Sequence, residues 1–243
     1  MRSPGRSDVM AMIRILSAGA AQAVVEGMAA VYRRDTGHEI QGVFSAVGAI
    51  RQRVLEGADA DVVLLTGALI DELVATGHVV AGSRADLGKV GTGVAVRAGT
   101  PAPDVSSAQG LRGSLLAASK IVCPDPATAT AGKVVMGVLE RLGIATQVHS
   151  RLQFFPNGYA AMKWLAESRG TGETGITQKT EILANPGVNY VGPLPGDLQV
   201  KTVYSAGLAA RASNAEGARA FIVRLTAPAA RNLLAKAGYE FDS

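Results

Sequence analysis

Residues 13–37 read IRILSAGAAQAVVEGMAAVYRRDTG, and they hold a short apolar run, a turn of small residues and an amphipathic helix pattern in that order. The run at 13–16 predicts a strand, and the apolar residues of 24–32 recur at the spacing of one helix face until Gly37 ends the helix. Two further strand–turn–helix units follow before residue 75. Short strands that alternate with amphipathic helices predict an α/β fold with mixed, mostly parallel sheets.

Two strands, near 91–98 and 201–209, are expected to cross between two lobes. Residues 188–196 contain two prolines and are predicted to lead into the second crossing strand. The predicted domains are a disordered tail at 1–11, a first lobe from 12–90 plus 205–243, and a second lobe from 91–204. This layout places a central cleft between the lobes, lined by turns at the carboxyl ends of strands.

Composition excludes several classes of protein. Hydrophobic residues make up 48% of the 243 residues and charged residues 18%, which allows a large buried core. The net charge of +4 is spread along the chain without long basic runs, so we expect no nucleic-acid partner. The single cysteine, Cys123, excludes an intrachain disulfide, and the three histidines stand far apart. We therefore expect neither a metal nor a cofactor.

The same reading bears on membranes and location. No apolar run reaches the roughly 18 residues of a membrane span, so we expect no direct membrane insertion. Arg14 interrupts the apolar stretch near the start, which therefore lacks the continuous core of an export signal. These features predict a cytoplasmic protein, or a periplasmic one if the start is truncated.

Small or hydroxyl-bearing residues follow the predicted strands, and most of them directly precede a helix. Helix N-termini present unpaired backbone N–H groups and a partial positive charge, so they can hold an anion without cationic side chains. Residues of these types are also common helix caps, which is the alternative explanation for any single turn. Several such turns around one cleft favour a ligand site. The turns lie at 17–20, 45–48, 66–67, 128–130 and 157–158.

Four stretches resemble the type II periplasmic binding proteins, and within them the molybdate-binding receptors of transporters. They are ILSAGAAQAVVEGMAAVYRRDTGHEI, FSAVGAIRQRVLEGADADVVLLTG, PDPATATAGKVVMGVLERLGI and NGYAAMKWLAESRGTGETGITQ, at 15–40, 44–67, 124–144 and 157–178. The resemblance covers nearly the whole chain from residue 12. It implies a two-lobed fold, a small anionic ligand in the cleft and, if the protein is exported, an ABC permease as partner.

This chain departs from the family pattern at the ligand. Members that bind molybdate read A-A-S-L after the first strand and G-S-S-G after the second, where this chain has Ala20, and Ala46 with Val47. The tyrosine of the family's G-I-V-Y segment falls on Gln178. An amide both donates and accepts hydrogen bonds, so it suits a carboxylate or hydroxy acid at least as well as molybdate.

The expected function is therefore to bind a small anion, either an organic carboxylate or an inorganic oxyanion such as molybdate, as a receptor. The alternative is a cofactor-free isomerase of a di- or tricarboxylate, because one branch of the fold resembles aconitate isomerase. That reaction needs a group that removes and returns a proton, and the sequence pattern does not identify one. The predicted ligand-binding residues are Ser17, Ala18, Ala20, Ser45, Ala46, Val47, Thr66, Thr128, Thr130, Asn157, Gly158 and Gln178.

Other candidates have plainer interpretations. We expect Cys123 to be a buried, inert thiol. We expect Lys179 and Glu181, beside Gln178, to form an exposed pair, and the alternative is that either of them reaches the rim of the cleft. Arg51 and Arg97 are further candidates for pairing with a ligand carboxylate.

Overall fold

A computed structural model describes residues 12–242, so the tail predicted at 1–11 lies outside the described residues. The strands are β1 (Met12–Ala18), β2 (Glu39–Ser45), β3 (Val62–Thr66), β4 (Ala85–Arg97), β5 (Lys120–Pro124), β6 (Leu152–Phe155), β7 (Glu173–Gln178), β8 (Val188–Pro193) and β9 (Lys201–Leu208). The α-helices are α1 (Gln22–Thr36), α2 (Val47–Leu55), α3 (Gly67–Ala75), α4 (Ala108–Ala117), α5 (Thr130–Arg141), α6 (Ala145–Val148), α7 (Gly158–Glu167), α8 (Lys179–Leu183), α9 (Ala215–Thr226) and α10 (Arg231–Ala237). Short 3-10 turns are η1 (Gly19–Ala21), η2 (His149–Arg151), η3 (Gly196–Leu198) and η4 (Pro228–Ala230).

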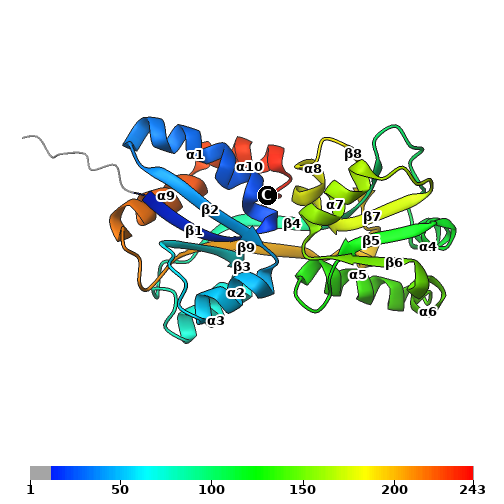
Figure 1. The fold of residues 1–243 in the computed structure, drawn as a ribbon, viewed down its shortest axis with the longest axis horizontal. Coiled ribbons are helices and arrows are strands. Elements are labelled where there is room, and N and C mark those ends of the chain that lie inside the picture. Colours follow the sequence, from blue (N-terminus) through cyan, green and yellow to red (C-terminus); the bar gives the residue numbers. More distant parts are fainter. Residues whose placement is uncertain (1–11, 243) are drawn as a thin grey trace, which may run out of the picture.

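The first lobe is built on the strand order β2-β1-β3-β9-β4. β1 pairs in parallel with β2 and β3, whereas β9 runs antiparallel to both β3 and β4. Every residue of β3 is buried, as expected of a central strand that is covered on both faces. Helices α1, α2, α3, α9 and α10 lie around this sheet on the left of Figure 1.

The second lobe repeats this arrangement with β6-β5-β7 parallel and with β4 and β8 antiparallel. Helices α4 to α8 lie around it on the right of Figure 1. Two buried clusters fill this lobe, one that contains Leu111 and Leu139 and one that contains Met162 and Leu165. The predicted two-lobed α/β fold with mixed sheets is confirmed. The sheets are less parallel than expected, because the described strands make four parallel and four antiparallel pairings.

The long strand β4 belongs to both lobes. Its residues 85–91 pair with β9, and its residues 92–97 pair with β7 and β8. The strand predicted near 91–98 is therefore longer than expected and begins at Ala85. β9 pairs over its whole length within the sheet of the first lobe. The division of the chain into domains remains a prediction.

Three short elements escaped the sequence analysis. α6 and α8 are too short to show a helical period, and β8 lies in the segment expected only to lead into the next strand. α8 matters most for function, because it begins directly after β7 at the centre of the molecule. Within residues 12–242, no helix is long and apolar enough to cross a membrane.

Candidate functional site

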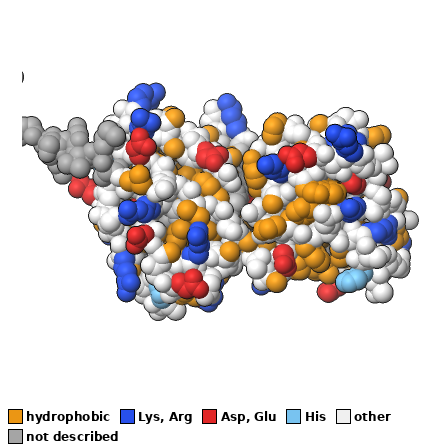
Figure 2. Space-filling view, viewed as in Figure 1, with side chains coloured by type: hydrophobic (Ala, Val, Ile, Leu, Met, Phe, Trp, Pro, Cys, Tyr) orange, Lys and Arg blue, Asp and Glu red, His pale blue; other side chains and the backbone are white. Residues whose placement is uncertain are grey.

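The turns that follow the parallel strands of the two lobes meet in the middle of the molecule. Figure 2 shows that the surface is notched between the lobes at this level. The cavity at this point has a volume of about 20 Å³, which is space for about one water molecule. It is lined by Ala18, Gly19, Ala20, Ser45, Ala46, Val47, Pro124, Ala129, Thr130, Ala131, Asn157, Gly158, Gln178, Glu181 and Tyr204.

Most of the residues predicted to bind a ligand line this cavity. They are Ala18, Ala20, Ser45, Ala46, Val47, Thr130, Asn157, Gly158 and Gln178. The first five lie at the carboxyl ends of β1 and β2 and in the residues that follow them in the first lobe, and the others come from the second lobe. Two lobes therefore contribute to one site, although binding by these residues remains a prediction.

Ser17, Thr66 and Thr128 are not among the lining residues. The Ser17 hydroxyl donates to the Ala18 carbonyl oxygen at 2.9 Å, so it is already occupied within the strand. Thr66 is the residue that precedes α3 and is buried. Thr128 contributes a backbone contact, because its carbonyl oxygen accepts from the Gly48 N–H at 2.9 Å.

The Gly48–Thr128 hydrogen bond joins the two lobes across the cleft. Gly48 lies in the first turn of α2, and Thr128 lies in the turn before α5. A Cβ placed on Gly48 would lie 2.8 Å from the Thr128 carbonyl oxygen, so only glycine permits this approach. The bond and the small cavity describe a closed arrangement of the lobes.

Helix starts face the cavity from both lobes. The residues that precede α2 and α5, Ala46 and Ala129, form no side-chain cap, so the first N–H groups of these helices lack a side-chain acceptor. Asn157 differs, because its Oδ1 accepts from the Ala160 N–H at 2.8 Å and caps α7. The Gly48 N–H of α2 donates to the Thr128 carbonyl oxygen, and the other N–H groups of the first turns, together with the helix dipoles, favour an anion in this position.

Gln178 is a polar side chain at the cavity that lacks hydrogen-bond partners. It is the last residue of β7, and it is 1% exposed. Neither its Nε2 nor its Oε1 has a hydrogen-bond partner. A buried polar group without a partner costs about 1–3 kcal/mol, so a ligand that pairs with this amide recovers that cost.

Glu181 corrects one of our predictions. It is 5% exposed and lines the cavity, so the expected exposed pair with Lys179 is wrong and the alternative, that one of the two reaches the cleft, holds for Glu181. It occupies the third position of α8, from which its carboxyl turns back toward the Gln178 N–H, as a glutamate does in a capping box. Its Oε2 also accepts from the Thr177 hydroxyl at 2.6 Å.

The surroundings of Glu181 raise the pKa of its carboxyl. Burial raises the pKa of the carboxyl, although the Thr177 hydroxyl and the backbone N–H groups of Gly158, Tyr159 and Gln178 act to lower it. Burial raises the pKa of Tyr204 and Tyr239 as well, and the negative charge of Glu181 adds to both shifts. Glu181 is the only titratable carboxyl among the residues that line the cavity, and the sequence analysis did not include it among the ligand-binding residues. The available signal in the sequence was the three-residue spacing from Gln178 to Glu181, which is that of a helix N-cap and a capping-box glutamate.

Candidates outside the cavity have other roles. Arg51 pairs with Glu72, and Arg97 donates to the Gly170 carbonyl oxygen at 3.3 Å, so neither meets the cavity. Cys123 is buried as predicted, and burial followed by the charge of Asp125 raises the pKa of its thiol to about 12. Across residues 12–242, no group of three His, Cys, Asp or Glu side chains could hold a metal ion.

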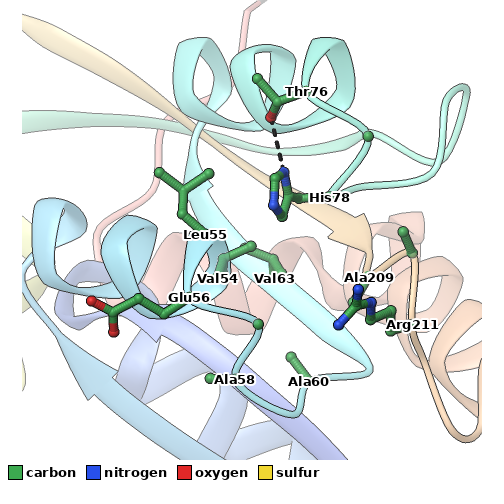
Figure 3. A pocket seen from close by; sticks show the side chains of 13 residues that line it. Val54, Leu55, Glu56, Ala58, Ala60, Val63, Thr76, His78, Ala209 and Arg211 are labelled. Carbon is green, nitrogen blue, oxygen red and sulfur yellow. Dashed lines mark hydrogen bonds between the residues drawn. The ribbon is translucent and has the colours of Figure 1, made fainter.

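A larger pocket, of about 490 Å³, lies at the end of the first lobe away from the cleft. Figure 3 shows His78 and Arg211 beside it, with the His78 ring 3.1 Å from the Thr76 hydroxyl. None of the predicted ligand-binding residues lines this pocket. The cleft is therefore the candidate site.

Two lobes joined by a shared strand, with helix starts and polar side chains from both around one cleft, define the class of type II periplasmic binding proteins. A family model described as bacterial extracellular solute-binding protein matches residues 13–240, and the chain belongs to this family.

Similar proteins agree with this assignment. An aconitate isomerase from Pseudomonas sp is 29% identical over 232 residues, which cover 93% of this chain and 86% of the relative. The Azotobacter vinelandii periplasmic molybdate-binding protein superposes with a TM-score of 0.79 at 20% identity, over 95% of this chain and 100% of that one. The sulfate-binding protein SubI from Mycobacterium tuberculosis superposes with a TM-score of 0.76 at 18% identity, over 94% of this chain and 86% of that one. These structures show the fold.

Proposed function

We propose that the protein is a receptor for a small organic anion, a di- or tricarboxylate, which it holds in the interlobe cleft. The observation that carries this proposal is the buried Gln178 amide, whose Nε2 and Oε1 both lack a partner. A carboxylate accepts from the amide nitrogen, and a hydroxyl or protonated carboxyl on the same molecule donates to the amide oxygen. A fully ionised inorganic oxyanion only accepts, so it would leave Oε1 unpaired.

The relatives support an anion as ligand in different ways. The solved neighbours are described as binding molybdate or sulfate, and the sequence relative acts on aconitate, as its name says. Ala20, Ala46 and Val47 stand where the molybdate-binding receptors carry their serine donors, which favours the organic ligand. The helix starts at α2 and α5 supply N–H donors for the negative charge.

The test is calorimetric titration of the protein with citrate, cis- and trans-aconitate, molybdate, tungstate and sulfate. We expect a polycarboxylate to bind, and we expect Gln178→Ala to weaken it more than tenfold, because a hydrogen bond to a charged group contributes about 1.5–3 kcal/mol. Gln109→Ala is the matched control, since Gln109 is an exposed glutamine on α4. Binding of the metal oxyanions alone would reject the proposal.

A second candidate is the cofactor-free isomerisation of a polycarboxylate, and Glu181 favours it. A carboxylate base can take a proton from the carbon next to a ligand carboxylate, and the resulting acid can return a proton to another carbon, so that a double bond moves. Incubation of cis-aconitate with the protein in deuterium oxide, followed by proton NMR, separates the candidates. Formation of an isomer, with or without deuterium, that Glu181→Gln abolishes identifies an enzyme, whereas an unchanged spectrum rejects isomerisation of this substrate.

For a receptor of this class, the partner would be an ABC permease, which it meets only outside the cytoplasm. Structural neighbours are described as substrate-binding components of ABC transporters. The permease partner and the cellular location both stay predictions. Fractionation of cells that express the protein from its native locus, with immunodetection in each compartment, tests the location.

A further inference from the structure

The two oxygens of Glu181 have different surroundings. Oε2 is held by the Thr177 hydroxyl at 2.6 Å. Oε1 faces the first lobe, because a Cβ placed on Gly19 in the turn after β1 would lie only 2.8 Å from it. Both Glu181 and Gly19 line the cavity. One oxygen is therefore fixed within the second lobe, and the other is presented to the place where a ligand would lie between the lobes.

No cation offsets the charge of this carboxyl. Among residues 12–242, no lysine or arginine forms an ion pair with Glu181. Lys179 lies on the same helix, but its Nζ is 3.7 Å from Glu240 and 5.7 Å from the centre of the Tyr190 ring. The titratable groups that face Glu181 from other elements are Tyr204 on β9 and Tyr239 after α10, and both are buried and uncharged.

A bound anion would therefore place a second negative charge beside a buried carboxylate that accepts from the Thr177 hydroxyl and from backbone N–H groups but has no cation as partner. Two like charges in one dry site oppose each other strongly, and the usual outcome is that one of them binds a proton. Because Oε2 already accepts from Thr177, Oε1 is the oxygen that can carry this proton toward the ligand. The O–H group then donates to a ligand oxygen, and a charge-assisted hydrogen bond replaces the repulsion.

We propose that Glu181 binds a proton when the cleft binds its anion, so that a rise in pH releases the ligand. This inference rests on the proposed function, because it needs an anion in the cleft. It makes Glu181 a specificity residue as well as a pH-sensitive one, since the neutral carboxyl donates to an anion and the ionised carboxyl repels it.

The first test needs no ligand. The Cδ resonance of Glu181, assigned by its loss in Glu181→Gln, is followed by carbon NMR as the pH of the unliganded protein is raised. We expect its midpoint to lie above about 4.3, the value of an unperturbed glutamate. A midpoint at or below that value overturns the inference, because an ionised carboxyl with a low proton affinity would not take up a proton on binding.

The second test measures affinity for cis-aconitate by calorimetry at a series of pH values at which the ligand itself is fully ionised. The dissociation constant should rise about tenfold per pH unit above the pKa of Glu181 in the unliganded protein. Glu181→Gln, which keeps the shape and can still cap α8, should lose this dependence. Glu140→Gln, at an exposed position of α5, is the control and should behave as the wild type.

A third measurement uses the wild type alone, in case Glu181→Gln does not fold. Binding enthalpies in buffers of different ionisation enthalpy give the number of protons taken up. We expect uptake of up to one proton per ligand, and zero uptake across the pH series overturns the inference. If no ligand binds at any pH while the Cδ midpoint is raised, the proposed function fails and proton uptake on binding fails with it, and only the raised pKa of Glu181 in the unliganded protein is retained. If a ligand binds with zero proton uptake, the proposed function stands and this inference alone is overturned.

Discussion

At the residue scale, Asp61 connects three segments with one carboxyl. Its Oδ2 accepts from the Arg14 N–H at 2.8 Å, and its Oδ1 accepts from the Ser213 hydroxyl and the Asn214 N–H at 3.0 Å each. An amide in its place can accept with only one of its two terminal atoms. Asp61→Asn should therefore lower the free energy of unfolding by about 1–3 kcal/mol, measured by urea unfolding at neutral pH.

This effect should depend on pH. Burial acts to raise the pKa of Asp61, but the donors from Arg14, Asn214 and Ser213 outweigh it, and the pKa lies below its usual value. A lowered native pKa gives stability that is present above the unfolded value of about 3.9 and is lost as the pH falls through the native value. The difference from Asp61→Asn should shrink over this acid range, whereas exposed Asp59→Asn should differ little from the wild type at any pH.

Cys123 provides a probe of the second lobe. Its side chain is fully buried on β5, and burial followed by the charge of Asp125 raises the pKa of the thiol to about 12. Since the thiolate is the reactive form, we expect no modification by an aromatic disulfide reagent at mildly alkaline pH in the folded protein. Modification should appear only with unfolding in urea. Rapid stoichiometric modification without denaturant would show that β5 opens locally.

Residue types at strand ends were enough to find Gln178, because it follows a recognisable strand and replaces a family tyrosine. They were not enough for Glu181 or Tyr204. A charged residue three positions after a strand is most often exposed, and only the turn of α8 buries Glu181. Tyr204 reaches the cavity from a strand that is distant in the sequence, so no local pattern marks it.

At the element scale, the approach of α2 to the turn before α5 should control closure. A Cβ on Gly48 would lie 2.8 Å from the Thr128 carbonyl oxygen, so Gly48→Ala should keep the lobes apart. We expect ligand affinity to fall more than tenfold, since donors from the two lobes no longer meet on one ligand. Calorimetry measures the affinity, and small-angle scattering with excess ligand should show a larger radius of gyration than for the wild type.

Gly137→Ala is the control for this variant, because a Cβ at this position of α5 meets nothing within 4 Å. Replacing glycine by alanine inside a helix should stabilise the protein by about 0.5–1 kcal/mol. Affinity should be unchanged in this control. Equal affinities for Gly48→Ala and the wild type would contradict the assigned role of the Gly48–Thr128 contact.

Elements were predictable where their pattern was long. α1 has 15 residues with a regular apolar face and a left-handed Gly37 at its end, so both its type and its end were found. α8 has five residues and β8 ends in a proline, which leaves no period to detect. The length of β4 also escaped prediction, because its first half is set by pairing with β9, and that partner lies far along the chain.

At the scale of the whole molecule, ligand binding should raise thermal stability. A ligand at a hundredfold excess over its dissociation constant adds about 2.7 kcal/mol to the free energy of unfolding. For a chain of 243 residues, each kcal/mol raises Tm by about 2–4 °C, so a shift of about 5–11 °C is expected. Differential scanning calorimetry measures it. A polycarboxylate that gives no shift at this excess would not be bound by the folded protein.

The pH dependence of the whole molecule's stability should contain a contribution from Glu181 that is opposite in sign to that of Asp61. Burial raises the pKa of Glu181 in the folded protein. The folded state then binds more protons than the unfolded state between about 4.3 and the native pKa, so this group's stabilising contribution falls as the pH rises through that window. In Glu181→Gln, residue 181 does not titrate, so it makes no pH-dependent contribution to the free energy of unfolding.

The free energies of unfolding of the wild type and Glu181→Gln should therefore diverge with pH. Relative to the variant, the wild type should be most stable below about pH 4.3, the unfolded pKa of glutamate, and should lose up to about 1.4 kcal/mol per pH unit above it, until the native pKa is reached. Urea unfolding of both proteins at closely spaced pH values, without ligand, gives the difference directly. A difference that stays constant across this range would mean that folding leaves the proton affinity of Glu181 unchanged, and proton uptake on anion binding would then need another group.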